Sequence, residues 1–138
     1  MLADLHTHSY YSDGAHNPDF VARRAADNGV TVLALTDHDC LDGYLNLRDS
    51  GIPAGLRLIP GVEISTLWEN HEIHVLGLCV DVENDTLGTV LENQRARRLA
   101  RIAEFDLTLT KAGIPGLMDF VNLTPAVCPG RSHVARFL

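Results

Sequence analysis

One short apolar run constrains the fold of this chain more than any other segment. Residues 30–35, with the sequence Val-Thr-Val-Leu-Ala-Leu, are almost entirely apolar and rich in β-branched side chains. A run of this length and composition is typical of a strand buried on both faces, as in a parallel sheet. Because parallel strands need long crossover connections, helices are expected between this strand and its neighbours.

Apolar runs on either side of this strand are separated by helical patterns, and this alternation predicts an α/β layered or barrel domain. Asn17 suits a helix N-cap, Pro18 the first helical turn and Gly29 the C-terminal stop. Strands are expected at residues 2–5, 56–64 (broken at Pro60-Gly61) and 73–80, helices at 18–28, 41–49, 86–112 and from 132 onward, and irregular structure around Pro115, Pro125 and Pro129.

Composition narrows the class of protein. Apolar residues make up 46% of the 138 residues, as in ordinary globular proteins, and the net charge of −7 argues against a DNA-binding surface. A phosphate substrate stays compatible, because bound divalent cations reverse the local charge. We find no signal peptide and no apolar stretch near the ~20 residues of a membrane span. Three cysteines fit no disulfide frame, so a cytoplasmic setting is expected.

Histidines and carboxylates follow the first two predicted strands. His6 and His8 are two residues apart, so on a strand both imidazoles face one side and could reach the same metal ion; two surface histidines are the alternative. Asp37 and His38 follow the strand at residues 30–35. There the alternative is a helix N-cap formed by Asp37 or Asp39.

Similar groups accompany the later strands. Glu63 ends the third strand, where burial is costly unless the carboxylate is paired or binds metal; an edge position or a salt bridge to an arginine is the alternative. His74 lies one residue into the fourth strand, whereas His71, three residues earlier, is expected in a loop. Asp13, in Ser12-Asp13-Gly14, taken alone suits a turn.

Four arginines lie on the helix predicted at residues 86–112. A solvated face with ion pairs to acidic residues of the same helix is favoured over contact with a substrate. The arginines are Arg95, Arg97, Arg98 and Arg101, and their expected partners are Glu92 and Glu104.

The ligand-type residues matter most as an ordered set, because each follows a predicted strand and all should meet at one rim of the sheet. Several ligands that converge in this way predict a site for two or three metal ions. Such a site, with ions about 3.5–4 Å apart, activates water and stabilises charge on a transferring phosphoryl group.

These residues form motifs that resemble the PHP (polymerase and histidinol phosphatase) superfamily over essentially the whole chain. The similarity is greatest to the branch of ribonuclease AM and the 3′,5′-nucleoside bisphosphate phosphatases, especially over residues 61–77 and 130–136. The motifs are Asp4-Leu5-His6-Thr7-His8-Ser9, Ser12-Asp13-Gly14, Thr36-Asp37-His38, Pro60-Gly61-Val62-Glu63-Ile64-Ser65 and His74-Val75-Leu76-Gly77.

The resemblance implies a distorted (β/α)7 barrel with a small helical insertion. Residues 1–84 and 129–138 would belong to the barrel and residues 85–128 to the insertion. A complete barrel of a related type has ~250 residues, so we expect this chain to form the N-terminal portion. The family takes further ligands from its C-terminal half, a histidine in an Ala-His-Pro-like motif and an Asp-x-His pair, and neither motif follows His133.

The resemblance also implies up to three divalent ions, commonly manganese and sometimes iron or zinc. The implied ligands are His6, His8 and Glu63 for the first ion, Glu63 and His74 for the second, and Asp13 and His38 for the third. Arg131 matches a phosphate-binding arginine, a task that suits its planar fork. His133 is expected to contact the phosphate or the leaving group, and Asp37 to orient a ligand.

Two functions follow from this resemblance. The first is a metal-dependent phosphoesterase in which a hydroxide bridging two ions attacks phosphorus. Its substrates would be 3′,5′-nucleoside bisphosphates or short RNA trimmed from the 5′ end, with no membrane or DNA partner. The alternative is a truncated, non-catalytic remnant of a PHP protein that acts as a binding or regulatory module. The presence of the N-terminal ligand-type residues favours the enzyme. The absence of the family's C-terminal ligands favours the non-catalytic remnant.

Overall fold

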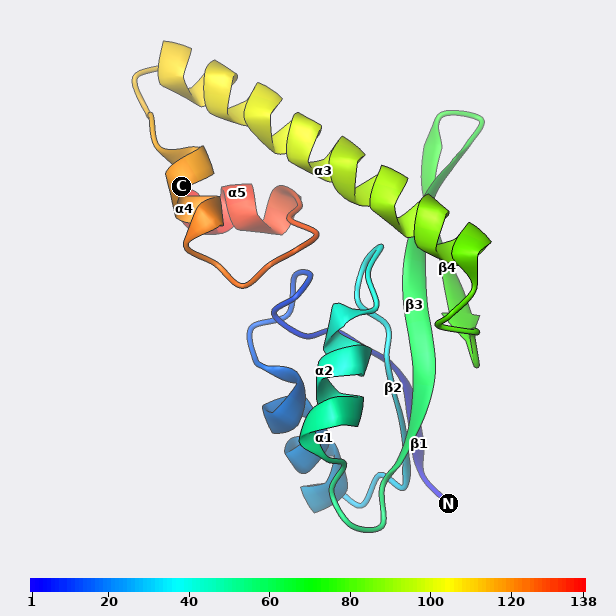
Figure 1. The fold of residues 1–138 in the computed structure, drawn as a ribbon. Helices are drawn as coiled ribbons and strands as arrows, with labels where there is room; N and C mark the ends of the chain where they lie inside the picture. The colour runs from blue at the N-terminus through cyan, green and yellow to red at the C-terminus, as the bar shows by residue number, and fades with distance from the viewer.

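The computed structural model describes all 138 residues and contains a four-stranded sheet in the order β1-β2-β3-β4 (Figure 1). The strands β1 (Ala3–Thr7), β2 (Val32–Leu35) and the first part of β3 (Arg57–Trp68) are parallel. The rest of β3 forms an antiparallel hairpin with β4 (His71–Leu78). Helices connect the parallel strands, so the predicted α/β class is confirmed.

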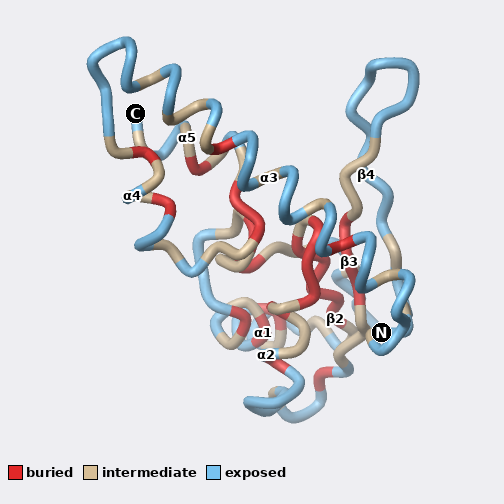
Figure 2. Tube along the Cα trace, turned by 45° about the horizontal axis from the view of Figure 1, so that its top comes forward, coloured by how far each residue is buried: buried red, intermediate tan, exposed pale blue.

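Two helices, α1 (Pro18–Asp27) and α2 (Asp42–Ser50), cover one face of the parallel strands (Figure 1). The Asn17 side chain accepts a hydrogen bond from the backbone N–H of Phe20 at 2.7 Å, which confirms the predicted N-cap. Full burial of each leucine in the core between helices and sheet contributes roughly 1.5–3 kcal/mol. This core contains Ala22, Ala25, Leu33, Leu35, Leu47 and Leu56, which are among the buried residues drawn in red in Figure 2.

The strand β3 is continuous through Pro60-Gly61, so the predicted break is wrong. Pro60 is the last residue paired with β2, and from Gly61 onward the strand pairs with β4 instead. Proline is tolerated here because it stands where one pairing partner replaces another. As a result Glu63 lies inside β3, where we expected a strand end, and His74 lies inside β4, as expected. His71 was expected in a loop but is the first residue of β4, paired with Trp68.

Three further helices form a second packed group beyond the sheet (Figure 1). They are α3 (Asp85–Lys111), α4 (Leu117–Asn122) and α5 (Arg131–Phe137), and the first and last match the predicted helices. The helix α4 lies where irregular structure was expected, because Leu117 and Val121 pack against Ile102 of α3. None of the helices has both the length and the apolar character needed to cross a membrane.

Candidate metal centre

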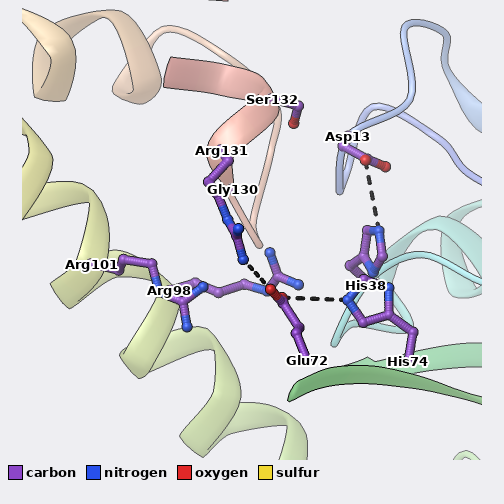
Figure 3. A pocket seen from close by; sticks show the side chains of 9 residues that line it. All are labelled: Asp13, His38, Glu72, His74, Arg98, Arg101, Gly130, Arg131 and Ser132. Carbon is purple, nitrogen blue, oxygen red and sulfur yellow. Dashed lines mark hydrogen bonds and ion pairs between the residues drawn. The ribbon is translucent and has the colours of Figure 1, made fainter. Parts of the chain in front are cut away.

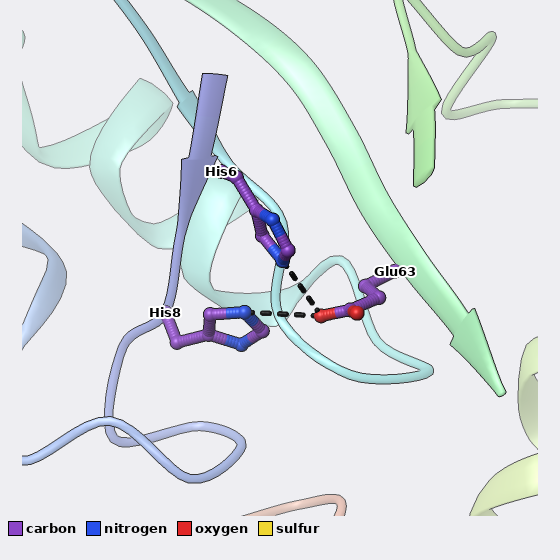
Figure 4. A group of neighbouring side chains, drawn as sticks. All are labelled: His6, His8 and Glu63. Atoms are coloured by element: carbon purple, nitrogen blue, oxygen red, sulfur yellow. Dashed lines mark hydrogen bonds and ion pairs between the residues drawn. The ribbon is translucent and has the colours of Figure 1, made fainter. Parts of the chain in front are cut away.

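The carboxylate of Glu63 lies among four imidazoles from different parts of the chain. Its Oε2 atom is 3.0 Å from Nε2 of His6 and 3.0 Å from Nε2 of His8 (Figure 4). The same atom is 3.5 Å from Nδ1 of His38. Its Oε1 atom is 3.1 Å from Nδ1 of His74. Residues that are up to 68 positions apart in the sequence therefore converge on one acid, as the ordered motifs predicted.

The sheet explains this convergence. His6 lies in β1 and His8 directly after it, while His38 follows β2 and forms an isolated parallel bridge with Glu63. His74 lies opposite Ser65 in the β3–β4 hairpin. Parallel pairing thus brings the carboxyl ends of β1 and β2 to the middle of β3, and the hairpin adds the last histidine.

Three overlapping groups of side chains could each hold a metal ion. Within each group one donor atom per residue lies within 4.8 Å of the others. Asp13 enters through its carboxylate, which is 3.3 Å from Nδ1 of His8 and 3.7 Å from Nε2 of His38. The groups are His6, His8 and Glu63; His8, Asp13 and His38; and His38, Glu63 and His74, so the structure brings together all six residues named from the sequence.

The protonation chemistry of the site fits a divalent cation. Burial opposes ionisation of Glu63, yet the hydrogen bond from His6 and the charges of His38 and His8 hold the pKa of Glu63 below its ordinary value. Burial lowers the pKa of His38, which favours the neutral, metal-binding imidazole. Nδ1 of His38 is buried and makes no hydrogen bond. An ionised carboxylate among imidazoles is a donor set suited to N- and O-coordinated metals.

Asp37 lies behind this cluster and holds the loop that carries two of its members. The carboxylate is 1% exposed and accepts hydrogen bonds from Ser9 N–H at 2.7 Å, Ser9 Oγ at 2.7 Å and Ser12 Oγ at 2.6 Å. It does not cap α2, whose N-cap is Leu41 without a side-chain hydrogen bond. Asp37 therefore orders the segment between His8 and Asp13.

A cavity of about 660 Å³ opens beside the cluster and contains no hydrophobic side chain in its lining (Figure 3). Asp13, His38 and His74 lie on one side of it, and Arg98, Arg101 and Arg131 lie on the other. Between them Glu72 forms ion pairs with both His74 and Arg131. An anion in this cavity would lie between the ligand-type residues and three guanidinium groups.

His133 differs from the other residues named from the sequence. Its ring is buried at the start of α5, and its Nδ1 accepts a hydrogen bond from the backbone N–H of Gly130 at 3.1 Å. The ring does not line the cavity. A contact between His133 and a phosphate or leaving group stays a prediction, and the visible role of the ring is to hold the turn before Arg131.

Sequence reasoning missed Asp39 and Arg98. Arg98 was expected on a solvated face, but its Nε donates to Asp39 at 2.7 Å and its Nη2 to Ser65 Oγ at 2.8 Å, so that expectation is wrong. Arg101 also lines the cavity, although it is exposed. The spacing of three residues places Arg98 and Arg101 on one helix face, but Arg95 and Arg98 have the same spacing, so this signal did not single out Arg98.

The fold and the donor set together define an α/β protein built around a cluster of metal-ligand side chains. A family model described as the PHP domain matches residues 4–123, which is most of the chain. The chain therefore belongs to the PHP domain family, as its motifs predicted.

Relatives and a solved structure agree with this assignment. The 5′-3′ exoribonuclease Rnm of Salmonella typhimurium is 41% identical over all of this chain and 48% of its own length. A 3′,5′-nucleoside bisphosphate phosphatase from Chromobacterium violaceum is 40% identical over 84% of this chain and 41% of its own. An amidohydrolase structure from C. violaceum with bound sulfate and no metal matches all of this chain and 49% of its own, with 37% identity and a TM-score of 0.87.

The chain thus spans about half the length of the relatives it matches. The high TM-score supports the predicted N-terminal portion of a PHP barrel as its fold. The division into a barrel part and an inserted part at residues 85–128 stays a prediction.

Proposed function

We propose that this protein is a metal-dependent phosphoesterase that hydrolyses phosphate esters of nucleotides. One observation carries the proposal: a cluster of six ligand-type side chains faces three arginines across a polar cavity. Metal ligands and arginines on opposite walls suit a phosphate group, whose oxygens accept from guanidinium forks and bind divalent cations.

Up to three divalent ions would be held, most naturally manganese, with iron or zinc also compatible with nitrogen and oxygen donors. His6, His8 and Glu63 would hold the first, Glu63 and His74 the second, and Asp13 and His38 the third. When bound, the ions would activate water and neutralise charge on the transferring phosphoryl group.

The side chains around the ions have separate tasks in this proposal. Arg131 and Arg101 would bind and orient the phosphate from the cavity wall opposite the ions. Asp37 would keep the Ser9–Ser12 turn fixed and so hold His8 and Asp13 in place. His133 would hold the turn before Arg131 through its hydrogen bond from the Gly130 N–H. A direct contact between His133 and the phosphate or the leaving group is a further part of the proposal.

The substrate class is inferred from the relatives, which are named for RNA and for nucleoside bisphosphates. Small nucleotides or short RNA are favoured over long nucleic acid, because the net charge of −7 provides no extended basic surface. Three free cysteines suit the cytoplasm. The non-catalytic alternative has no specific contact in its favour.

The test is release of inorganic phosphate from adenosine 3′,5′-bisphosphate with Mn²⁺. We expect Glu63→Gln and His74→Ala to lower the rate by more than about a hundredfold, because each removes a proposed ligand. His71→Ala is the matched control, since His71 lies in the same hairpin, is exposed, and its ring hydrogen-bonds the Glu69 carbonyl rather than a residue of the cluster. Full activity in Glu63→Gln would contradict the bridging role. Wild-type protein that binds Mn²⁺ and nucleotide without turnover would favour the binding module.

A further inference from the structure

A buried ion pair outside the ligand cluster connects α3 to the metal centre. Arg98 Nε donates to Asp39 Oδ2 at 2.7 Å, and the two side chains are 13% and 1% exposed. A pair buried this deeply is favourable only where further hydrogen bonds satisfy both partners. The further hydrogen bonds of Asp39 and Arg98 therefore show which segments of the chain this ion pair connects.

The first set of contacts reaches the middle of β3. Asp39 Oδ1 accepts the backbone N–H of Ser65 at 2.8 Å, and Arg98 Nη2 donates to the hydroxyl of the same serine at 2.8 Å. The backbone N–H of Asp39 donates to the carbonyl of Glu63 at 2.9 Å. Asp39 adopts a left-handed φ of 53°, which Asp tolerates better than most residues. It thus joins the segment after His38 to the strand that carries Glu63.

The second set reaches the turn that precedes α5. Arg98 Nη1 donates to the carbonyl of Pro129 at 3.5 Å, and Cys128 Sγ donates to the carbonyl of Asp39 at 3.4 Å. A Cβ at Gly130 would lie 3.0 Å from Arg98 Nη1, so the turn packs closely on the guanidinium. Arg131 follows directly. The pair therefore contacts both the ligand-bearing strand and the segment that presents a cavity arginine.

We propose that Asp39 and Arg98 are positioning residues that fix the arginine wall of the cavity at its distance from the metal ligands. Asp39 does not line the cavity and would act only through Arg98 and the Cys128–Gly130 turn. The inference rests on the proposed phosphate site and adds residues that the sequence motifs did not include.

Asp39→Asn provides a test in which two explanations predict opposite signs. Removing a negative charge near a phosphate site would tighten phosphate binding if Asp39 acted only through its charge. If it positions the arginine wall, binding should weaken by roughly tenfold, as is common for supporting residues behind a metal site. The measurement is calorimetric titration of the Mn²⁺-loaded protein with inorganic phosphate, after circular dichroism has shown that the variant is folded.

Two further variants keep the test decisive. Ser65→Ala removes one partner of the pair without changing charge, and we expect it to weaken phosphate binding in the same direction but less. Arg95→Gln is the control for a change of charge on the helix that carries Arg98, because Arg95 is exposed. Its change of charge is equal in size and opposite in sign to that of Asp39→Asn. Tighter or unchanged phosphate binding in Asp39→Asn would overturn the proposal.

A second readout does not depend on phosphate. In nuclear magnetic resonance spectra without added metal, Asp39→Asn should shift the amide signals of residues 130–132, whereas Arg95→Gln should not. Unchanged amide signals in Asp39→Asn would overturn the positioning role by themselves. If the wild-type protein bound no phosphate, the proposed function would fail, and these amide signals alone would decide the role of the pair.

Discussion

At the scale of single residues, the close approach of Gly43 to Asp37 shows how tightly the support of the site is packed. A Cβ at Gly43 would lie 2.1 Å from Asp37 Oδ2 and 2.7 Å from Ser9 Oγ. The carboxylate already accepts three hydrogen bonds from the Ser9–Ser12 turn and cannot move without losing them. A glycine early in α2 is therefore required by the packing of Asp37 and Ser9, although it lowers helix propensity.

This packing predicts a stability difference between two glycine substitutions. Gly43→Ala should destabilise the protein by about 1–3 kcal/mol, because the new methyl group displaces Asp37. Gly88→Ala, on the exposed side of α3 with open space around it, should stabilise it by roughly 0.5–1 kcal/mol. Urea unfolding of both variants provides the comparison. Equal effects of the two substitutions would show that the Asp37 network can relax.

At the scale of elements, the start of α5 depends on a buried neutral histidine. Burial lowers the pKa of His133, and the charge of Arg136 acts in the same direction. The unfolded chain therefore binds a proton more readily than the folded one as pH falls through the ordinary histidine pKa. The stability contributed by the neutral ring is complete above that pKa and decreases below it.

We therefore expect the wild-type protein to lose more stability between about pH 7.5 and pH 5.5 than His133→Asn does. Asparagine retains an acceptor for the Gly130 N–H but does not titrate. The measurement is the urea midpoint of both proteins at the two pH values. The same loss in both would assign the pH dependence to other groups, among which His38 also has a pKa lowered by burial.

Most strands and helices, and most of the candidate site, could be predicted from the sequence. Alternating apolar runs and caps predicted the strands and most helices. Ligand-type residues associated with strands predicted five members of the cluster, whereas Asp13 was implied only by the family resemblance. The helix α4 could not be predicted, because packing on Ile102 stabilises it rather than its own pattern. Asp39 and Arg98 were missed since their pairing joins positions 59 apart, and nothing local distinguishes Arg98 from Arg95.

At the scale of the whole molecule, the side chains of the candidate metal centre come from β1, the loop after β2, β3 and β4, and they meet only in the folded chain. A divalent cation bound there should stabilise the native state by mass action, by about 2.7 kcal/mol when its free concentration is a hundred times the dissociation constant. The check is the unfolding midpoint with Mn²⁺ and with a chelator. Glu63→Gln should remove most of the difference, and an unchanged difference would place the ion elsewhere.

The position of Glu63 in the middle of β3 also has a consequence for the order of folding. Its imidazole neighbours come from positions 57, 55 and 25 residues earlier and 11 residues later, so only the hairpin contact is local. Distant pairings of this kind form late, because a long loop must close first. A cation that needs all of them would engage after the rate-limiting step, and so would lengthen the lifetime of the native state without hastening its formation.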